Sequence, residues 1–420
     1  MKGTVKYSLI LLLLPSILFG QTVRKELPDL ECARFDRNRI EFQGDSSSFE
    51  TFFRKMDALL FEGSGNVRIL HIGGSHVQAG TLTRQLRNDL LSLGSNLDGG
   101  RGLVFPFSAA KTNNPSSFRT RYGGEWKAVR NVSREPEKKL GLTGMALSSS
   151  DSSAFVRIVL KARNATPADP SFIFDKVDVL GYSSGGERVP LIVLESGDTL
   201  SGFRDEQASC WSFALPEPKD SITVAVSRGT GELTLTGLLL DNVKPGFSVT
   251  GIGVNGASLP SYLRCEDFER DLGMVKPDLV VFAIGINDAT GKEFSKDLFI
   301  SRYKSLVALI RAVNPDCALL FVTNNDSFRR VRRRVYSVNK NGLEVEKAFF
   351  QLASDCGAGV WDLFDIMGRL GSMKDWEEAG LAKSDKVHFT EEGYALVGDL
   401  LYNALMGKYV EHLRRRVSWD

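Results

Sequence analysis

Two spacings of apolar residues open the chain, a helical one and then a strand-like one. Between residues 46 and 60 apolar side chains recur three and four apart behind a run of serines, which predicts an amphipathic helix. Its apolar face comprises Phe49, Phe52, Phe53, Met56, Leu59 and Leu60. Residues 67–72 read as the first strand, and Leu82, Leu86 and Leu90 mark a second helix.

The pattern changes from about residue 105 to residue 245. Short β-rich runs replace the helical spacing, and Gly, Ser, Pro and Asp clusters separate them. This spacing is typical of an antiparallel β-sandwich. The runs are AFVRIVLKA, FIFDKVDVLGY, VPLIVLE, SITVAVS and ELTLTGLLL. We therefore expect a separate β-domain, inserted into the chain at 105–245.

Strands and helices alternate again from residue 246. The runs FSVTGIGVNGAS, DLVVFAIGIND, CALLFVT and AGVWDL predict strands, and residues 298–313 and 343–353 predict helices. The last helix starts near Thr390. Such alternation predicts an α/β fold, a parallel sheet with helices on both faces. Residues 21–104 and 246–420 would together form this domain.

Residues 1–20 have the pattern of a secretory signal, with Lys2 and Lys6, an apolar core and small Gly20. We therefore expect an exported protein, periplasmic or secreted, without a lasting membrane anchor. The formal net charge is +2 and 42% of residues are hydrophobic, which is ordinary for a globular protein. This balance gives no reason to expect a nucleic-acid partner, and the sequence assigns no oligomeric state.

The five cysteines are scattered and odd in number. One disulfide is open to an exported protein, but a disulfide framework is not expected, and Cys317 reads as a core residue. Neither a zinc spacing nor a glycine-rich phosphate loop occurs. No metal and no cofactor are therefore expected.

Polar residues follow the predicted strands at the edge where ligands bind in such sheets. The first strand leads into Gly73, Gly74, Ser75 and His76, the second into Asn255 and Gly256, and the third into Gly285, Asn287 and Asp288. After the last strand, Asp385 stands three residues before His388. Each fragment alone is typical of a turn or a helix cap. Four of them in order at one edge point to an active site.

These four blocks resemble those of the SGNH (GDSL-like) hydrolases, with Ser75, Gly256, Asn287 and the pair Asp385 and His388 as the matching residues. The resemblance covers the two flanking parts of the chain. It is strongest to bacterial peptidoglycan and polysaccharide O-acetylesterases, which often carry an inserted β-sandwich of carbohydrate-binding type. It implies a flavodoxin-like three-layer α/β/α sandwich. Gly74 departs from the family, which usually has Asp there, and this bears on the geometry of the nucleophile turn.

A serine hydroxyl needs an adjacent base to act as a nucleophile. Of the four histidines, His71 lies within an apolar strand and His412 within a basic tail that we expect to be solvated. His76 follows Ser75 directly, so its side chain should diverge from that of the serine. His388 is the predicted base, with Asp385 to orient it.

Ester attack also needs donors for the oxyanion that forms. The N–H groups of Ser75 and Gly256 and the side-chain amide of Asn287 can supply three. Asp288 cannot donate when ionised, so we interpret it as a loop cap.

Three more residues are candidate substrate contacts: His76, Gln78 and Trp376. Asn113 is a further one; Gln78 and Asn113 are each more typical of a turn, and packing of the last loop explains Trp376 equally well. The run SFRRVRRRVYS reads as a solvated loop, with contact to an anionic glycan as the alternative.

The sequence thus predicts a secreted serine esterase that removes O-acetyl groups from a polysaccharide, with peptidoglycan as the expected polymer. Two alternatives remain: a lipase or thioesterase of the same fold, and a catalytically silent glycan-binding protein.

Overall fold

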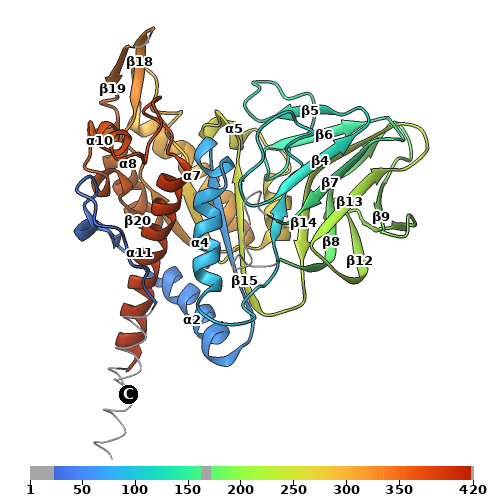
Figure 1. Cartoon of the computed structure of the whole chain (residues 1–420), viewed down its shortest axis with the longest axis horizontal. Helices are drawn as coiled ribbons and strands as arrows, with labels where there is room; N and C mark the ends of the chain where they lie inside the picture. Colours follow the sequence, from blue (N-terminus) through green and yellow to red (C-terminus); the bar gives the residue numbers. More distant parts are fainter. Residues whose placement is uncertain (1–22, 162–171, 334, 418–420) are drawn as a thin grey trace, which may run out of the picture.

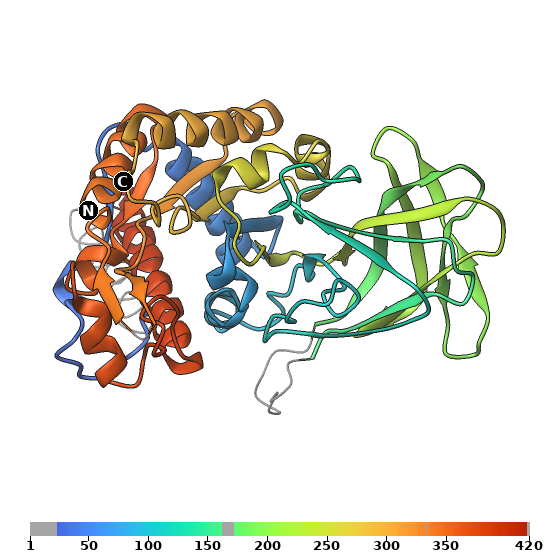
Figure 2. The same cartoon turned by 90° about the horizontal axis from the view of Figure 1, so that it is seen from above.

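The computed structural model describes residues 23–161, 172–333 and 335–417. The expected signal at 1–20 lies outside these residues. An α/β part and a β-rich part lie side by side (Figures 1 and 2). Within the described ranges, none of the helices combines the length and apolar content that a membrane span requires.

The α/β part is built on a six-stranded sheet in the order β1-β20-β17-β16-β2-β15. Its parallel strands, in chain order, are β2 (Asn66–Gly73), β15 (Gly246–Gly253), β16 (Leu279–Ala283), β17 (Ala318–Val322) and β20 (Gly359–Trp361). Counted along the chain, their spatial order is 2-1-3-4-5, the flavodoxin-like arrangement.

One strand departs from the predicted parallel sheet. β1 (Ile40–Phe42) pairs antiparallel with β20 at the edge. Sequence reasoning missed it, because three residues are too few to show a period. An antiparallel edge strand on an otherwise parallel sheet is common.

Helices cover both faces of this sheet. α2 (Ser47–Glu62), α4 (Thr81–Leu91) and α11 (Glu391–Val417) pack on one side. α6 (Phe268–Val275), α7 (Lys296–Val313) and α8 (Gly342–Cys356) pack on the other. β2 serves both layers, because Val67 and Ile69 point into one core and Leu70 and Ile72 into the other. The apolar face predicted for α2 is buried, except that Leu60 is only partly so.

The β-rich part consists of two antiparallel sheets. One has the order β10-β9-β13-β7-β4 and the other β11-β12-β8-β14-β6-β5, with β3 also paired to β14. The five predicted runs contain β7 (Phe155–Val159), β8 (Phe174–Ser184), β9 (Pro190–Val193), β13 (Ser221–Val226) and β14 (Glu232–Asp241). The others are β3 (Gly102–Val104), β4 (Arg119–Gly123), β5 (Lys127–Arg130), β6 (Met145–Ser149), β10 (Thr199–Ser201), β11 (Phe203–Asp205) and β12 (Cys210–Lys219).

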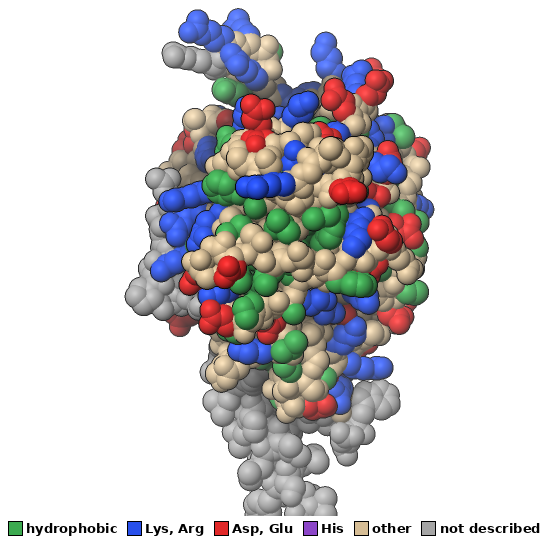
Figure 3. Space-filling model, turned by 90° about the vertical axis from the view of Figure 1, so that its right-hand side faces the viewer, with side chains coloured by type: hydrophobic (Ala, Val, Ile, Leu, Met, Phe, Trp, Pro, Cys, Tyr) green, Lys and Arg blue, Asp and Glu red, His purple; other side chains and the backbone are tan. Residues whose placement is uncertain are grey.

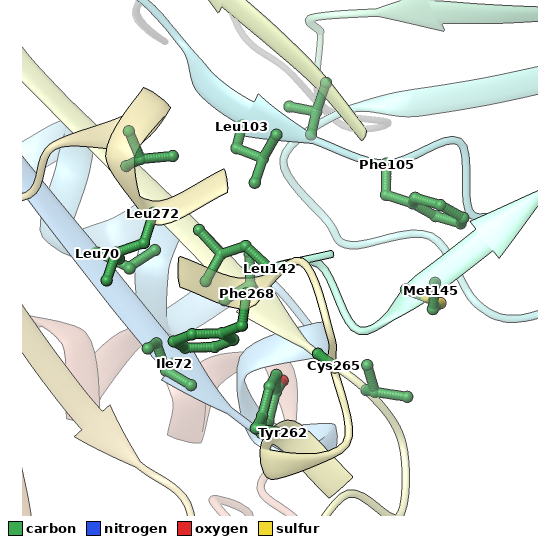
Figure 4. Packing of buried hydrophobic residues seen from close by; sticks show 14 of the residues in the cluster. Leu70, Ile72, Leu103, Phe105, Leu142, Met145, Tyr262, Cys265, Phe268 and Leu272 are labelled. Carbon is green, nitrogen blue, oxygen red and sulfur yellow. The ribbon is translucent and has the colours of Figure 1, made fainter. Parts of the chain in front are cut away.

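The two parts share one apolar core. Leu70 and Ile72 of β2 belong to the same buried cluster as Phe268 of α6 and as Leu103 and Met145 of the β-rich part (Figure 4). Removing such side chains from water stabilises the contact by roughly 25 cal/mol per Å² of apolar surface. The β-rich part is therefore packed against the α/β part and not merely tethered to it.

The five cysteines are free thiols, and Cys317 is buried as predicted. Short helices complete the α/β part: η1 (Phe35–Arg37), α3 (Ser75–Gln78), α5 (Leu259–Leu263), α9 (Leu363–Ile366) and α10 (Ser372–Glu378).

The prediction of a solvated His412 is wrong. Its side chain is buried, with Nδ1 2.6 Å from Glu50 Oε2 and Nε2 3.1 Å from Asp57 Oδ2. α11 packs on α2, so carboxylates of α2 face a histidine of α11. The basic residues that surround His412 in the sequence do not reveal this long-range pairing.

His71 is buried in β2, as predicted. Its Nδ1 lies 2.8 Å from Thr83 Oγ1, whereas Nε2 has no partner among the described residues. Burial lowers the pKa of His71 to about 3, so the folded protein holds this ring neutral at neutral and mildly acidic pH.

This burial predicts an acid-dependent loss of stability. Below about pH 6.5 the unfolded chain protonates His71 and the folded protein does not, so the free energy of unfolding falls as the pH falls. His71→Gln should flatten the curve between about pH 6 and about pH 4 by up to about 1.4 kcal/mol per pH unit. Denaturant unfolding of both proteins across this range measures the slopes. Parallel curves would contradict the prediction, whatever their offset.

Candidate active site

Ser75 stands where β2 ends and α3 begins. Its Oγ lies 2.8 Å from Nε2 of His388. Gly74, the departure from the family pattern, forms the turn before it, and Tyr262 Oη donates a 2.7 Å hydrogen bond to the carbonyl of Gly73. A Cβ at Gly74 would meet Ala257 O and Asn287 Nδ2 at 3.5 Å, which is ordinary contact. The turn thus holds the serine within reach of the histidine without the usual aspartate.

Asp385 holds the far side of the His388 ring. His388 Nδ1 lies 2.8 Å from Asp385 Oδ2, and Asp385 Oδ1 accepts the backbone N–H groups of Val387 and His388 at 2.9 Å. Partial burial would raise the pKa of Asp385, but these hydrogen bonds outweigh it and hold the pKa well below its usual value. The carboxylate is therefore ionised and fixes the ring with Nε2 toward Ser75.

His76 supports His388 from behind. The two rings stack with centroids 5.1 Å apart, and the hydroxyl of Tyr394 lies 3.0 Å from His76 Nδ1. Burial, with His388 nearby, lowers the pKa of His76 to about 3. His76 is thus a neutral, fixed surface that limits rotation of the His388 ring.

Ser75, Gly256, Asn287 and His388 line one cavity of about 590 Å³. Among the described residues, no acceptor pairs with the N–H of Ser75 or of Gly256. The Asn287 amide gives one N–H to Ala257 O at 2.8 Å, which leaves its second N–H available. Three donors therefore border the space in front of Ser75.

Gly256 is needed for its backbone conformation. Its φ is +82°, in the left-handed region that favours glycine, whereas a Cβ would meet only Val132 at 3.8 Å. The backbone conformation, and not contact with neighbouring protein atoms, therefore accounts for a glycine at this position. Asp288 accepts the N–H of Leu259 at 3.1 Å and caps α5, and burial raises its pKa to about 6.

The three predicted substrate contacts do not line the cavity. Trp376 is fully buried and donates its indole N–H to Cys32 O at 2.9 Å, so of the two alternatives for this residue the packing role holds and sugar stacking does not. His76 and Gln78 are also buried, behind the cavity wall. Asn113, the further candidate, does line it.

Gln78 joins three segments of the site. Its Oε1 accepts the N–H of Asn255 at 2.7 Å, and its Nε2 donates to Thr112 Oγ1 at 2.9 Å and to Asn113 O at 3.0 Å. It thereby fixes the loop that presents Gly256 relative to the helix that presents Ser75.

Sequence reasoning missed most of the remaining lining residues. They are Ala79, Asn255, Ile286, Thr290, Ser327, Phe328, Arg329, Lys383, Val387 and Tyr394. Asn255 was placed at this edge from the sequence, and Ile286 and Thr290 lie in a loop after a strand, where position alone could have singled them out. Tyr394 comes from α11, and no local pattern marks it.

The arginine-rich run is not the expected loop. It forms an antiparallel hairpin of β18 (Phe328–Arg332) and β19 (Val335–Val338), which projects from the α/β part (Figure 1). The strand sequences FRRVR and VYSV have no period of two, so the sequence carries no strand signal here, and most of their side chains are exposed.

Comparison with known proteins gives the class. Residues 220–396 match the GDSL-like Lipase/Acylhydrolase family; this range contains Gly256, Asn287, Asp385 and His388, and Ser75 lies upstream of it. A peptidoglycan O-acetylesterase structure superposes with a TM-score of 0.70 at 21% identity, over 91% of this chain and 99% of that chain. No curated protein matches the sequence.

Two further structures share less. The acetyl xylan esterase AlAXEase has a TM-score of 0.31 at 23% identity, over 38% of this chain and 81% of its own. A family two carbohydrate esterase from Cellvibrio japonicus has a TM-score of 0.26 at 11% identity, over 72% of this chain and 99% of its own. Scores this low carry no argument about the fold.

The family match at 220–396 and the shared fold together support a carboxylic ester hydrolase of the SGNH type. Over residues 220–396, less than half of its length, the chain is similar to the GDSL-like Lipase/Acylhydrolase family.

Gln78 yields a prediction about positioning. Gln78→Ala removes the bonds that hold the Asn255–Gly256 loop, so kcat for a small acetyl ester should fall about 10- to 100-fold with little change in KM. Steady-state kinetics on p-nitrophenyl acetate measure both constants.

Gln85→Ala is the matched control, since Gln85 bonds to Asp399 at 2.9 Å away from the cavity. A loss confined to thermal stability, with kcat of the folded Gln78 variant intact, would show that Gln78 has only a structural role.

Proposed function

We propose that this protein is an exported serine esterase that hydrolyses O-acetyl esters on a glycan, with peptidoglycan as its polymer. One observation carries the catalytic part. Ser75, His388 and Asp385 form an unbroken hydrogen-bonded chain, with 2.8 Å at both links, at a cavity lined by Ser75, Gly256 and Asn287, each of which has an N–H without an acceptor among the described residues. Such a chain is the arrangement that activates a serine hydroxyl.

The reaction would proceed in two halves. His388 Nε2 takes the proton of Ser75 as Oγ attacks the acetyl carbonyl, and the donors of Ser75, Gly256 and Asn287 stabilise the oxyanion. Collapse breaks the bond to the sugar oxygen, which receives the proton from His388. Water, deprotonated by His388, then attacks the acetyl-serine; acetate leaves and Ser75 regains its proton. Asp385 stays ionised throughout and stabilises the imidazolium.

The lining of the cavity supports a small acyl group on a polar substrate. Asn113, Thr290 and Lys383 offer hydrogen-bonding groups for hydroxyls, and Ile286 and Val387 offer apolar surface for a methyl. Asn113 comes from the β-rich part of the chain, which supports a role for that part as a carbohydrate-binding domain beside the site. Binding energy remote from the reacting bond can orient a large substrate. The fold is shared with a protein described as a peptidoglycan O-acetylesterase.

The decisive substrate test compares acyl groups and polymers. Wild-type protein should release acetate from O-acetylated peptidoglycan with a higher kcat/KM than from acetylated xylan. On p-nitrophenyl esters the rate should fall as the acyl chain lengthens beyond acetate. A rate that rises with chain length would favour the lipase or thioesterase alternative.

Ser75→Ala should lower ester hydrolysis by about 10⁴-fold or more, because no other group in the chain replaces the nucleophile. A fluorophosphonate probe should label Ser75 in the wild type, and His388→Ala should prevent labelling. Peptide mapping by mass spectrometry locates the label.

Ser327→Ala is the matched control, since Ser327 lines the same cavity outside the hydrogen-bonded chain. It should keep both labelling and most of the activity. Wild-type protein that resists the probe while folded would favour the silent glycan-binding alternative.

A further inference from the structure

The strongest concentration of one charge lies in the β18–β19 hairpin and its flanks, residues 327–340. These fourteen positions carry five arginines, one lysine and no acid. The chain as a whole has a net charge of +2, so the remainder is net negative, at −4. On the face shown in Figure 3, by contrast, acidic and basic side chains are interspersed.

Three of the arginine side chains in this hairpin have no partner in the described part of the chain. The side chains of Arg330, Arg332 and Arg333 are exposed and form no ion pair or hydrogen bond there. Like charges held this close repel one another, and the fold does not offset the repulsion with carboxylates. A bound ligand with negative charges would offset this repulsion.

The base of the hairpin is fixed to both sides of the candidate active site. Phe328 N–H donates to Lys386 O at 3.0 Å, in the loop that carries His388. Arg329 donates to Gly291 O at 2.9 Å and Asn339 to Ala289 O at 3.1 Å, in the loop after Asn287. An isolated two-stranded hairpin is marginally stable, so these bonds set its direction. Phe328 and Arg329 also line the cavity of Ser75.

We propose that the β18–β19 hairpin is a binding arm for carboxylate groups of an anionic polysaccharide, and that it holds the polymer across the Ser75 cavity. This inference rests on the proposed function and narrows its substrate class to anionic glycans, such as peptidoglycan with its peptide carboxylates. Guanidinium groups suit the arm, since each binds a carboxylate through two parallel hydrogen bonds.

A membrane surface is the other polyanion that such an arm could meet, since Val331 and Tyr336 are exposed beside the arginines. The position of the hairpin favours the glycan. Arg329 lines the cavity of Ser75, so the row of cations leads to the place where a polymer ester must enter. A hairpin inserted into a lipid surface would instead cover that entrance.

The test compares three variants with the wild-type protein. Arg330→Gln/Arg332→Gln/Arg333→Gln removes three charges from the arm. The corresponding triple lysine variant keeps the charges but lacks the paired N–H donors of the guanidinium group. Arg54→Gln/Arg228→Gln/Arg414→Gln removes three exposed charges that do not line the cavity. Each is made in the wild type for kinetics and in Ser75→Ala for binding.

In kinetics, the glutamine variant should raise KM for O-acetylated peptidoglycan roughly tenfold, the size expected when three exposed charge pairs are lost. Its kcat/KM on p-nitrophenyl acetate and on uncharged acetylated xylan should change less than about twofold. The lysine variant should fall between, and the control should match wild type. If the glutamine variant lost kcat/KM equally on charged and uncharged substrates, the proposal that the hairpin is a binding arm would be overturned.

In binding, the Ser75→Ala proteins are sedimented with insoluble peptidoglycan and with phosphatidylglycerol vesicles. At about 0.01 M salt the arm variant should lose most of its retention on peptidoglycan, and at about 1 M salt all proteins should bind equally weakly, since the Debye length shrinks from about 30 Å to about 3 Å. Retention equal to wild type, or binding to vesicles without binding to peptidoglycan, would overturn the proposal.

Sedimentation also separates this inference from the proposed function. If wild-type protein cleaves p-nitrophenyl acetate but releases no acetate from peptidoglycan, the deacetylation proposal fails. The inference about the arm is then tested independently by the retention of the Ser75→Ala proteins on peptidoglycan.

Discussion

The hydrogen bond between Ser75 and His388 joins two residues 313 positions apart in the chain. Neither residue can find the other locally, so the contact depends on the strand order of the sheet. β2 lies between β15 and β16, and the loop of His388 returns to this edge after β20. Asn325 donates to Val387 O at 3.0 Å and ties that loop to the end of β17. The sheet thus brings the hydroxyl of Ser75 to the ring of His388, and loop-to-loop bonds fix their separation.

Burial divides the site into reacting and supporting groups. The side chains of His388 and Asp385 are 33% and 44% exposed, which leaves them open to substrate. Their supports, His76 and Gln78, are buried and cannot rotate freely. A positioned reacting group with a rigid support needs little reorganisation as the reaction proceeds. This division also explains why His76 and Gln78 were predicted as substrate contacts. Their position next to Ser75 in the sequence places them near the site, but it does not show whether their side chains face the cavity or the protein interior.

Much of the α/β part could be predicted from the sequence, because its strands and helices have strong local periods. The face of α2 and the residues that end β2, β15 and β16 follow directly from those periods. His412 and Trp376 could not be predicted, since their environments are made by α2 and by the backbone at Cys32, far away in the chain. The hairpin at Phe328 was missed for another reason. Its strands, FRRVR and VYSV, have no period of two, so the local sequence carries no strand signal.

The β-rich part shows how an insertion can join a fold without disturbing its catalytic edge. It enters after α4 and leaves into β15, so both connections lie on strands or helices next to β2. β15 pairs with β2 along its whole length, from Gly246 opposite Asn66 to Gly253 opposite Gly73. The insertion therefore cannot move without moving the strand that presents Ser75. Its Asn113 is bonded through Gln78 to the loop of Gly256. Substrate held by the β-rich part would thus be held in the same rigid frame as the reacting groups, which is the condition under which remote binding energy can lower an activation barrier.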